Sequence, residues 1–452
     1  MLFKNNKIKL FFLICNDNYK MNNIMHFLNK FEAIGTDINN VFLKRYNKNE
    51  NNKLNFKNTL YASILALKNK GIESVSTDLD IDHVTDVSKN AIIKARNNKK
   101  SFTSIKKMND ELINIIYDSE NNFIQPYNCI FCNKKNSYID SKNTINKSLF
   151  INRTKKRFIG CDGFQLNVNK SLINNDDIKC SKSGEYGIAL ISNLFDVMNK
   201  IPINYGLTKS NEINFNKKKV NETTGLLDQL HLLNSNDILI LDNWYFSKNL
   251  QQTFIEKDIG YIFRMKYNSN YFLDMKFETS KVIKINGKDV QLFKYKIKKH
   301  EYYILTSITE KITISEIKAL YWRRWKVETD IKKFKYDILS SDIRSRKYNS
   351  FLVDIESIRF ISIISSIIEY LGKDDLKFKK KFNTTNCIHV LYRNLLKLIF
   401  YSNDKVEICR ILGIIYKKII PLINNRSCLR KRVKPSTKWN TNGNRFGNKK
   451  QL

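Results

Sequence analysis

Three features that would place a chain of this size in a familiar class are missing: a dense set of cysteines, a long apolar run and a clear targeting segment. The eight cysteines are scattered over 452 residues, which suits a reducing compartment. The apolar runs "IKLFFLIC" (8–15) and "FISIISSIIEYL" (360–371) fall short of the roughly 20 residues that a membrane span needs. No small-residue cleavage site follows the first run. We therefore expect an intracellular protein.

A zinc site also lacks support. "CIFC" at 129–132 is the only close pair of cysteines, and a structural zinc needs two further ligands at short spacing. The next cysteines, Cys161 and Cys180, are distant and unpaired. Ordinary thiols at Cys129 and Cys132 are the simpler interpretation.

Charge, in contrast, is abundant and unbalanced. Lys and Arg number 79, Asp and Glu 43, and the formal net charge is +36. A field of this sign favours polyanionic partners such as DNA. AT-rich codons would also enrich Lys, Asn and Ile without any functional purpose. They do not explain why arginines cluster at 323–324, 344–346 and 426–431. We expect a DNA-associated protein in a nucleoid, a nucleus or a viral setting.

The first 150 residues are expected to be mainly helical. Apolar spacing predicts a helix over 56–71, and a second stretch, 86–117, reads as two helices broken by "NNKK". This pair would carry Lys94 and Arg96 on its outside, where they could contact DNA. A solvated helical hairpin explains the same spacing equally well.

From residue 157 the pattern changes to strands. Alternating segments predict strands over 157–168, 184–196 and 201–208. The nearly apolar run "NDILILD" (236–242) is typical of a strand buried on both faces. The other expected elements are helices over 223–233 and 247–260, a strand over 261–267, β-structure over 271–308 with an Asn286-Gly287 turn, a helix from Thr313 to about Tyr336, a helix over 349–372 and one or two more over 384–425.

This order predicts an α/β fold with an RNase H-like catalytic core. The expected regions are a helical N-terminal region over 1–150 as a candidate DNA-end-binding part, the catalytic domain over 151–340 with a β insertion over 271–308, a helical region over 341–425, and a basic, disordered tail over 426–452. An α/β fold alone does not define a function, so the site must.

Two aspartates occupy the strands that are neighbours in such a sheet. Asp162 lies in the first strand, and Asp242 ends the central one. Adjacent carboxylates repel each other unless a cation neutralises them, and oxygen-only ligands suit Mg²⁺ or Mn²⁺. Gly163 would leave room for a metal or a phosphate. A third carboxylate from a helix across the sheet would complete a two-metal site for phosphodiester chemistry.

Glu328 can supply that carboxylate. Tyr321, Arg324, Glu328 and Lys335 fall within an arc of about 60° on a regular helix. This stripe places an acid among a phenol and two cations, as DNA strand transfer requires. A plain salt-bridged helix, with Glu328 paired to Arg324, explains the isolated segment. That interpretation does not explain why Asp162 and Asp242 precede Glu328 in the order that the proposed two-metal site requires.

The segment "YWRRWKVETDIKKFK" (321–335) resembles the Y-(2)-R-(3)-E-(6)-K signature of insertion-sequence DDE transposases of the group named after insertion sequence four. The resemblance extends over about 157–372. It implies that Asp162, Asp242 and Glu328 are catalytic ligands of two Mg²⁺ or Mn²⁺ ions. It also implies that Tyr321, Arg324 and Lys335 contact transposon-end DNA, and that a homodimer performs cut-and-paste transposition on two double-stranded ends.

One departure concerns the residues after Asp242. The family often has a basic residue and a glycine there, whereas this chain has "DNWYF" (242–246). Trp244 could stack on an unpaired base or fill a packing position, and packing is slightly favoured. At least one of Trp322 and Trp325 is expected to pack on the sheet. A catalytically dead derivative, another RNase H-like nuclease such as a resolvase or a piggyBac-like enzyme, and a basic scaffold are the alternatives.

Overall fold

The computed structural model describes residues 32–39, 54–68, 71–81, 87–117, 156–209, 222–266, 269–297, 300–309, 312–339, 343–371, 380–399, 405–418 and 420–421. The interpretations of Cys129 and Cys132, and of the tail over 426–452, lie outside these residues. In the described part no helix is long and apolar enough to span a membrane.

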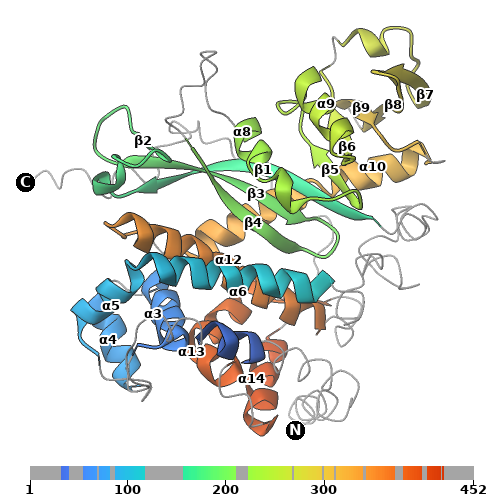
Figure 1. Ribbon diagram of the computed structural model, residues 1–452. Coiled ribbons are helices and arrows are strands. Elements are labelled where there is room, and N and C mark those ends of the chain that lie inside the picture. Colours follow the sequence, from blue (N-terminus) through green and yellow to red (C-terminus); the bar gives the residue numbers. More distant parts are fainter. Residues whose placement is uncertain are drawn as a thin grey trace, which may run out of the picture.

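The centre of the fold is a nine-stranded mixed sheet (Figure 1), which confirms the α/β class. Its strands are β1 (Arg157–Val168), β2 (Ile178–Cys180), β3 (Gly187–Asp196), β4 (Ile201–Thr208), β5 (Asp237–Leu241), β6 (Gly260–Arg264), β7 (Thr279–Ile285), β8 (Lys288–Ile297) and β9 (His300–Thr306). The order is β2-β3-β1-β5-β6-β9-β8-β7, with β4 also paired to β3. Only β1, β5 and β6 run parallel to one another.

The expected β insertion extends this sheet rather than forming a separate one. Strand β9 pairs with β6, and β8 and β7 follow outward. The turn between β7 and β8 has positive φ at Asn286 (50°) and at Gly287 (75°). Both residues tolerate this conformation, which two-residue hairpin turns of the matching twist require. The Asn-Gly hairpin prediction is therefore confirmed.

Helices cover both faces of the sheet. On one face lie α8 (Glu222–Leu227) and α9 (Lys248–Glu256), whose apolar residues share a core with β5 and β6. On the other face lie α10 (Ile314–Trp322), α11 (Trp325–Lys332), the π-helical turn η6 (Lys333–Ile338) and α12 (Tyr348–Leu371). The sheet is thus the middle layer of three (Figure 1).

Helices from both ends of the chain pack together below α12 (Figure 1). From the N-terminal side come α3 (Phe56–Lys68), α4 (Ile72–Ile81), α5 (Lys89–Arg96) and α6 (Lys99–Tyr117), and from the C-terminal side come α13 (Thr384–Ile399) and α14 (Lys405–Lys417). The expected break between α5 and α6 is present, and the Ser88 hydroxyl accepts a hydrogen bond from the Ala91 N–H. The regions over 1–150 and 341–425 therefore share one core in the described residues.

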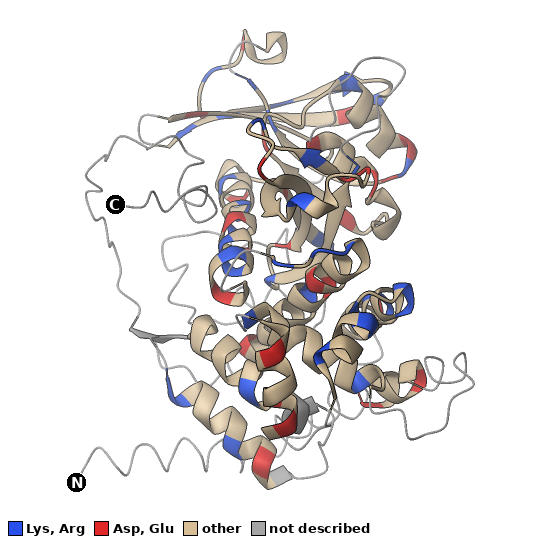
Figure 2. Ribbon diagram, turned by 90° about the vertical axis from the view of Figure 1, so that its left-hand side faces the viewer, with Lys and Arg blue, Asp and Glu red and all other residues tan. Residues whose placement is uncertain are grey.

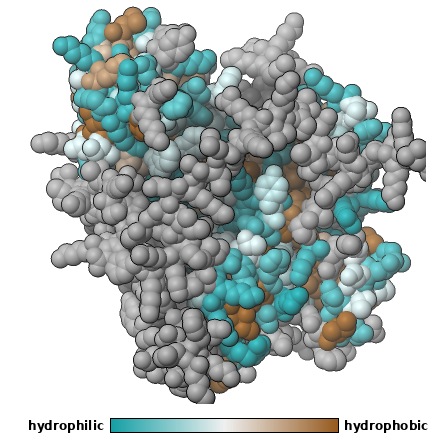
Figure 3. All heavy atoms as spheres, turned by 180° about the vertical axis from the view of Figure 1, so that it is seen from behind, coloured by the Kyte–Doolittle hydropathy of each residue, from teal (hydrophilic) through white to brown (hydrophobic). Residues whose placement is uncertain are grey.

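Basic and acidic residues are interleaved over both the sheet and the helical layer (Figure 2). On the face seen from behind, hydrophobic residues form small separate patches among hydrophilic ones (Figure 3). In the described part of the chain, the basic residues are therefore spread over several elements and are not gathered on one helix.

Arg96 does not lie on the outside, so that expectation is wrong. It is buried and donates to Asp354 of α12, which also accepts a 2.5 Å hydrogen bond from Ser345. Arg96 is buried because, in the packed structure, the face of α5 that carries it is turned toward α12. Lys94, two residues earlier, is exposed as expected.

We predict that Arg96→Ala lowers the free energy of unfolding by about 3–5 kcal/mol, because it leaves the Asp354 carboxylate buried without its cation. Lys94→Ala, which removes an exposed cation from the same helix, is the matched control and should change stability little. Urea unfolding monitored by circular dichroism measures both. Equal effects of the two substitutions would contradict the buried ion pair.

Candidate active site

The pairing of β1 with β5 places two aspartates side by side. In the parallel register Arg157 is opposite Asp237 and Gly160 is opposite Ile240. Asp162 and Asp242 each lie two residues beyond the last pair, so they continue the same register. The expectation that these strands are neighbours is confirmed. The start of the register is fixed by a buried bidentate ion pair, in which Arg157 donates to Asp237 over 2.6 and 2.7 Å.

A glycine lets α11 approach β1 closely. A Cβ at Gly160 would lie 2.3 Å from Val327 Cγ2 and 2.9 Å from Val197 Cγ1, so any larger residue would push the helix away. Val327 is fully buried against the sheet, and Glu328 is the next residue. This close contact is what brings the Glu328 side chain to the two aspartates.

A buried polar network anchors the same helix. The Asp330 carboxylate accepts hydrogen bonds from Asn193 Nδ2 on β3 (3.0 Å) and from the Tyr205 hydroxyl on β4 (2.7 Å). A third, longer bond comes from Ser362 on α12 (3.4 Å). Because buried polar groups are stable only with partners, this network fixes the position of α11 along the sheet.

Arg324 joins the three acids. Its guanidinium lies 3.8 Å from Asp162 Oδ2, 3.6 Å from Asp242 Oδ2 and 3.3 Å from Glu328 Oε1. The Arg324 side chain is only 4% exposed, whereas the acids are 24%, 28% and 34% exposed. One buried cation therefore stands at the point where carboxylates from β1, from the end of β5 and from α11 converge.

The donor set fits a hard divalent cation, because all three groups offer carboxylate oxygens only. In the described residues, however, no three His, Cys, Asp or Glu side chains are close enough together to hold a metal ion as they stand. A guanidinium occupies more space than an ion, whose oxygen ligands lie at about 2.0–2.1 Å for Mg²⁺. The acids would have to close in, and Arg324 would have to withdraw.

Burial and mutual repulsion shape the electrostatics of the site. Burial raises the pKa of Asp162 to about 6; Arg324 opposes this rise, and the charges of Glu328 and Asp242 add to it. A fourth acid, Glu222 at the start of α8, is affected in the same way. Burial, followed by the charges of Asp162 and Asp242, raises its pKa to about 7.

Sequence reasoning missed Glu222. Gly163 was the available signal, because a glycine beside Asp162 indicates that something approaches the backbone there. The structure shows the side chain of Glu222 in that place, where the expectation was a metal or a phosphate.

The helix expected from Thr313 to about Tyr336 is instead three segments. Thr313 and Glu316 form the expected capping box. The helix is then interrupted at Arg323 and Arg324, and η6 follows α11 as a π-helical turn. Because a π turn holds more residues than an α turn, the calculated 60° stripe does not extend to Lys335. Such turns are frequent at functional sites.

The two outer members of the signature lie at different distances from the acids. Tyr321 is buried, and burial, followed by the charge of Asp242, raises its pKa. Lys335 is half-buried with its Nζ 5.0 Å from the ring of Phe164, which is two residues beyond Asp162 on β1. The structure thus brings Tyr321 close to Asp242 and places Lys335 beside Phe164, farther along β1. The contact of both residues with DNA stays a prediction.

The tryptophans are more exposed than expected. Trp244 is 80% exposed, with Lys266 Nζ 5.8 Å from its ring, so the interpretation as a packing residue is wrong. Trp322 and Trp325 are 56% and 42% exposed, and neither is buried against the sheet. Trp325 instead lies over Arg324, whose Cζ is 5.0 Å from the ring. The break at Arg323 and Arg324 turns both indoles outward.

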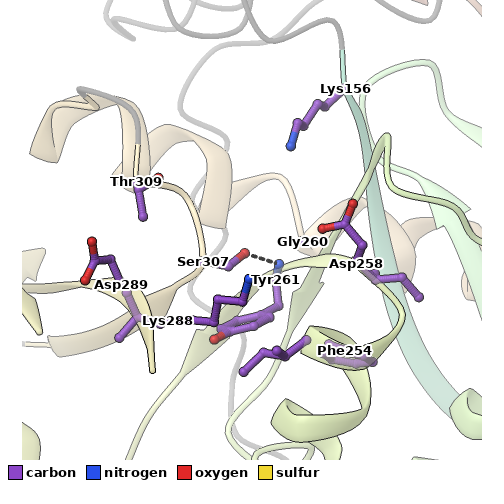
Figure 4. Close-up of a pocket in the computed structure, with 12 residues that line it drawn as sticks. Lys156, Phe254, Asp258, Gly260, Tyr261, Lys288, Asp289, Ser307 and Thr309 are labelled. Carbon is purple, nitrogen blue, oxygen red and sulfur yellow. Dashed lines mark hydrogen bonds between the residues drawn. The ribbon is translucent and has the colours of Figure 1, made fainter. Parts of the chain in front are cut away.

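A pocket of about 320 Å³ lies at the opposite end of the parallel strands (Figure 4). Lys156 and Gly260, at the starts of β1 and β6, line it, and the Tyr261 N–H donates to Ser307 Oγ over 2.9 Å. Strands β1, β5 and β6 run away from this pocket toward Asp162 and Asp242. The pocket is therefore separate from the acids.

We predict that Asp162→Asn makes the metal-free protein increasingly more stable than the wild type as pH rises from about 4 to 7. The raised pKa means that the folded chain binds the proton more tightly than the unfolded chain does, so stability falls with pH between the two pKa values. Urea unfolding in EDTA measures the difference. A stability difference that does not change with pH for Asp162→Asn would contradict the prediction.

Comparison with known proteins adds a family match. Residues 156–364 match the family model described as "Transposase DDE domain", which covers the chain from the start of β1 into α12. No curated protein gives a significant match. Among solved structures, a piggyBac transposase synaptic complex with hairpin DNA aligns over 90% of this chain and 85% of its own, with 14% identity and a TM-score of 0.36. A score of that size does not establish a common fold.

Proposed function

We propose that this chain is a DNA transposase, a polynucleotidyl transferase with an RNase H-like core. The observation that carries the proposal is the convergence of Asp162, Asp242 and Glu328 on a single buried cation. The match of residues 156–364 to a transposase DDE domain supports it. So does the order of β3, β1, β5 and β6 in the sheet, which agrees with an RNase H-like core. The YREK signature remains a sequence resemblance.

The three carboxylates would hold two Mg²⁺ or Mn²⁺ ions at the end of β1 and β5. Ions at such a site activate a water or a 3′-hydroxyl and stabilise the leaving oxygen of the phosphodiester. Arg324 would have to move when the ions bind, because its guanidinium lies between all three acids, within 4 Å of each. Released from them, its planar guanidinium suits a phosphate of the bound strand.

The surface around the acids supports double-stranded DNA as the partner. Lys335 would add a second phosphate contact beside Phe164. Trp244 offers an exposed ring two residues after Asp242, and base stacking on such a ring contributes about 1–3 kcal/mol per base. Lys94 is the exposed cation of the N-terminal helices. A homodimer that holds two transposon ends fits this activity.

We predict that Asp242→Asn and Glu328→Gln each lower strand cleavage by roughly a thousandfold or more, since losing several kcal/mol of metal-dependent stabilisation has that effect on a rate. The substrate is DNA carrying the inverted repeats that flank the gene, with Mg²⁺ present. Both variants should keep DNA binding, measured by gel shift, because each removes a negative charge.

Asp274→Asn is the matched control, since it removes an exposed carboxylate that is not among the acids around Arg324. It should cleave like the wild type. Full cleavage by either site variant would contradict the assignment of the acids. Loss of DNA binding along with cleavage would show that the substitution had damaged the fold.

A further inference from the structure

The side chain of Glu222 occupies the space that Gly163 leaves open beside Asp162. A Cβ at Gly163 would lie 2.4 Å from Glu222 Cγ, 2.8 Å from Cδ and 3.0 Å from Oε1. A Cβ at this position would therefore fit only if the Glu222 side chain moved away. The Gly163 N–H donates to Asp162 Oδ1 over 3.0 Å, so the Asp162 carboxylate bonds to the same residue against which Glu222 lies.

Glu222 reaches the site from the opposite face of the sheet to Glu328. Side chains alternate along β1, and Gly160 and Phe164 meet α11 and η6 on one face. Cys161 faces Tyr245 and the core under α8 on the other, and Gly163 is on the same side as Cys161. The two glutamates therefore approach Asp162 and Asp242 from the two faces, just beyond the end of β5.

The position of α8 is fixed by close contacts with β3 and β4. A Cβ at Gly225 would lie 2.2 Å from Thr208 Oγ1 and 2.8 Å from Ser192 Cβ, so the helix lies directly on the strands. Gln229, which follows α8, is buried and donates to the Ser192 carbonyl over 3.1 Å and to the Gly225 carbonyl over 2.9 Å. This attachment aims Glu222 at the acids.

Glu222 has no counter-ion in the described part of the chain. Arg324 pairs with the other three acids, and no hydrogen bond or ion pair of the Glu222 carboxylate is found among the described residues. A partly buried carboxylate next to two others is unfavourable without a cation. Two glycines and a buried glutamine nevertheless hold it there.

We propose that Glu222 is a fourth carboxylate ligand of the divalent cations, on the side of Asp162 and Asp242 away from Glu328. This inference rests on the proposed metal-dependent function and deepens it. The chemistry is that of a hard cation: an oxygen ligand with no competing partner among the described residues, held against the residue that follows Asp162. Glu222 thereby adds a negative charge that Arg324 does not neutralise.

The experiment is a titration of the full-length protein with Mn²⁺, in which free Mn²⁺ is followed by electron paramagnetic resonance. Glu222→Gln, which keeps the shape and removes the charge, should weaken Mn²⁺ binding by roughly tenfold or more or remove one bound ion. The matched control is Asp228→Asn, an exposed acid on the same segment, which should bind Mn²⁺ like the wild type. Unchanged affinity and stoichiometry in Glu222→Gln overturn the inference.

Gly163→Ala provides a second test that does not alter any carboxylate. The added methyl would displace the Glu222 side chain, so this variant should show the same loss of Mn²⁺ affinity as Glu222→Gln. In a Glu222→Ala background, where space is free, the same substitution should have little further effect. Independent, additive losses would contradict the inference, as would wild-type affinity in Gly163→Ala.

The outcomes separate this inference from the proposed function. If the wild type binds Mn²⁺ and Asp242→Asn abolishes the binding, the proposed metal site stands whatever Glu222→Gln shows. Wild-type binding by Glu222→Gln then overturns only the role of Glu222. A wild type that binds no Mn²⁺ overturns both. Circular dichroism of each variant confirms that the fold is retained.

Discussion

The parallel pairing of β1 with β5 is the constraint on which the candidate site depends. A buried bidentate pair between Arg157 and Asp237 fixes its register at one end. A shift by one residue would turn either Asp162 or Asp242 to the opposite face of the sheet. With the register fixed, the carboxylates of Asp162 and Asp242 lie close together beyond the end of β5. Because they repel each other, a nearby positive charge stabilises them. Arg324 supplies that positive charge in this structure.

Glycines decide what else can reach the two aspartates. Gly160 admits α11 on one face of β1, and Gly163 admits the side chain of Glu222 on the other. The Asp330 network then holds α11 against β3, β4 and α12. The site therefore combines rigid elements with one long side chain, Arg324, which can change partners without a change in the fold. Under the proposed function, such an arrangement would let divalent cations replace the guanidinium of Arg324 among the carboxylates.

Several strands, one hairpin and one helix cap could be predicted from the sequence, because local patterns of residues determine them. Strand β1 over 157–168, strand β4 over 201–208, the Asn286-Gly287 hairpin and the cap at Thr313 all follow from alternation and turn chemistry. At other positions, however, contacts between elements that are distant in sequence determine which side chains are buried. Arg96 is buried because α12 packs on its face of α5, and Trp322 and Trp325 are exposed where the helix is interrupted between them. Glu222 was missed because its partners are distant in sequence.

The central claim is that Asp162, Asp242 and Glu328 form a site for divalent cations that Arg324 occupies in their absence. Anomalous diffraction from crystals soaked in Mn²⁺ tests it most directly. The account predicts Mn²⁺ peaks among these three carboxylates, with the guanidinium of Arg324 withdrawn from them. Peaks elsewhere, or no peak with Arg324 still paired to all three acids, would contradict it.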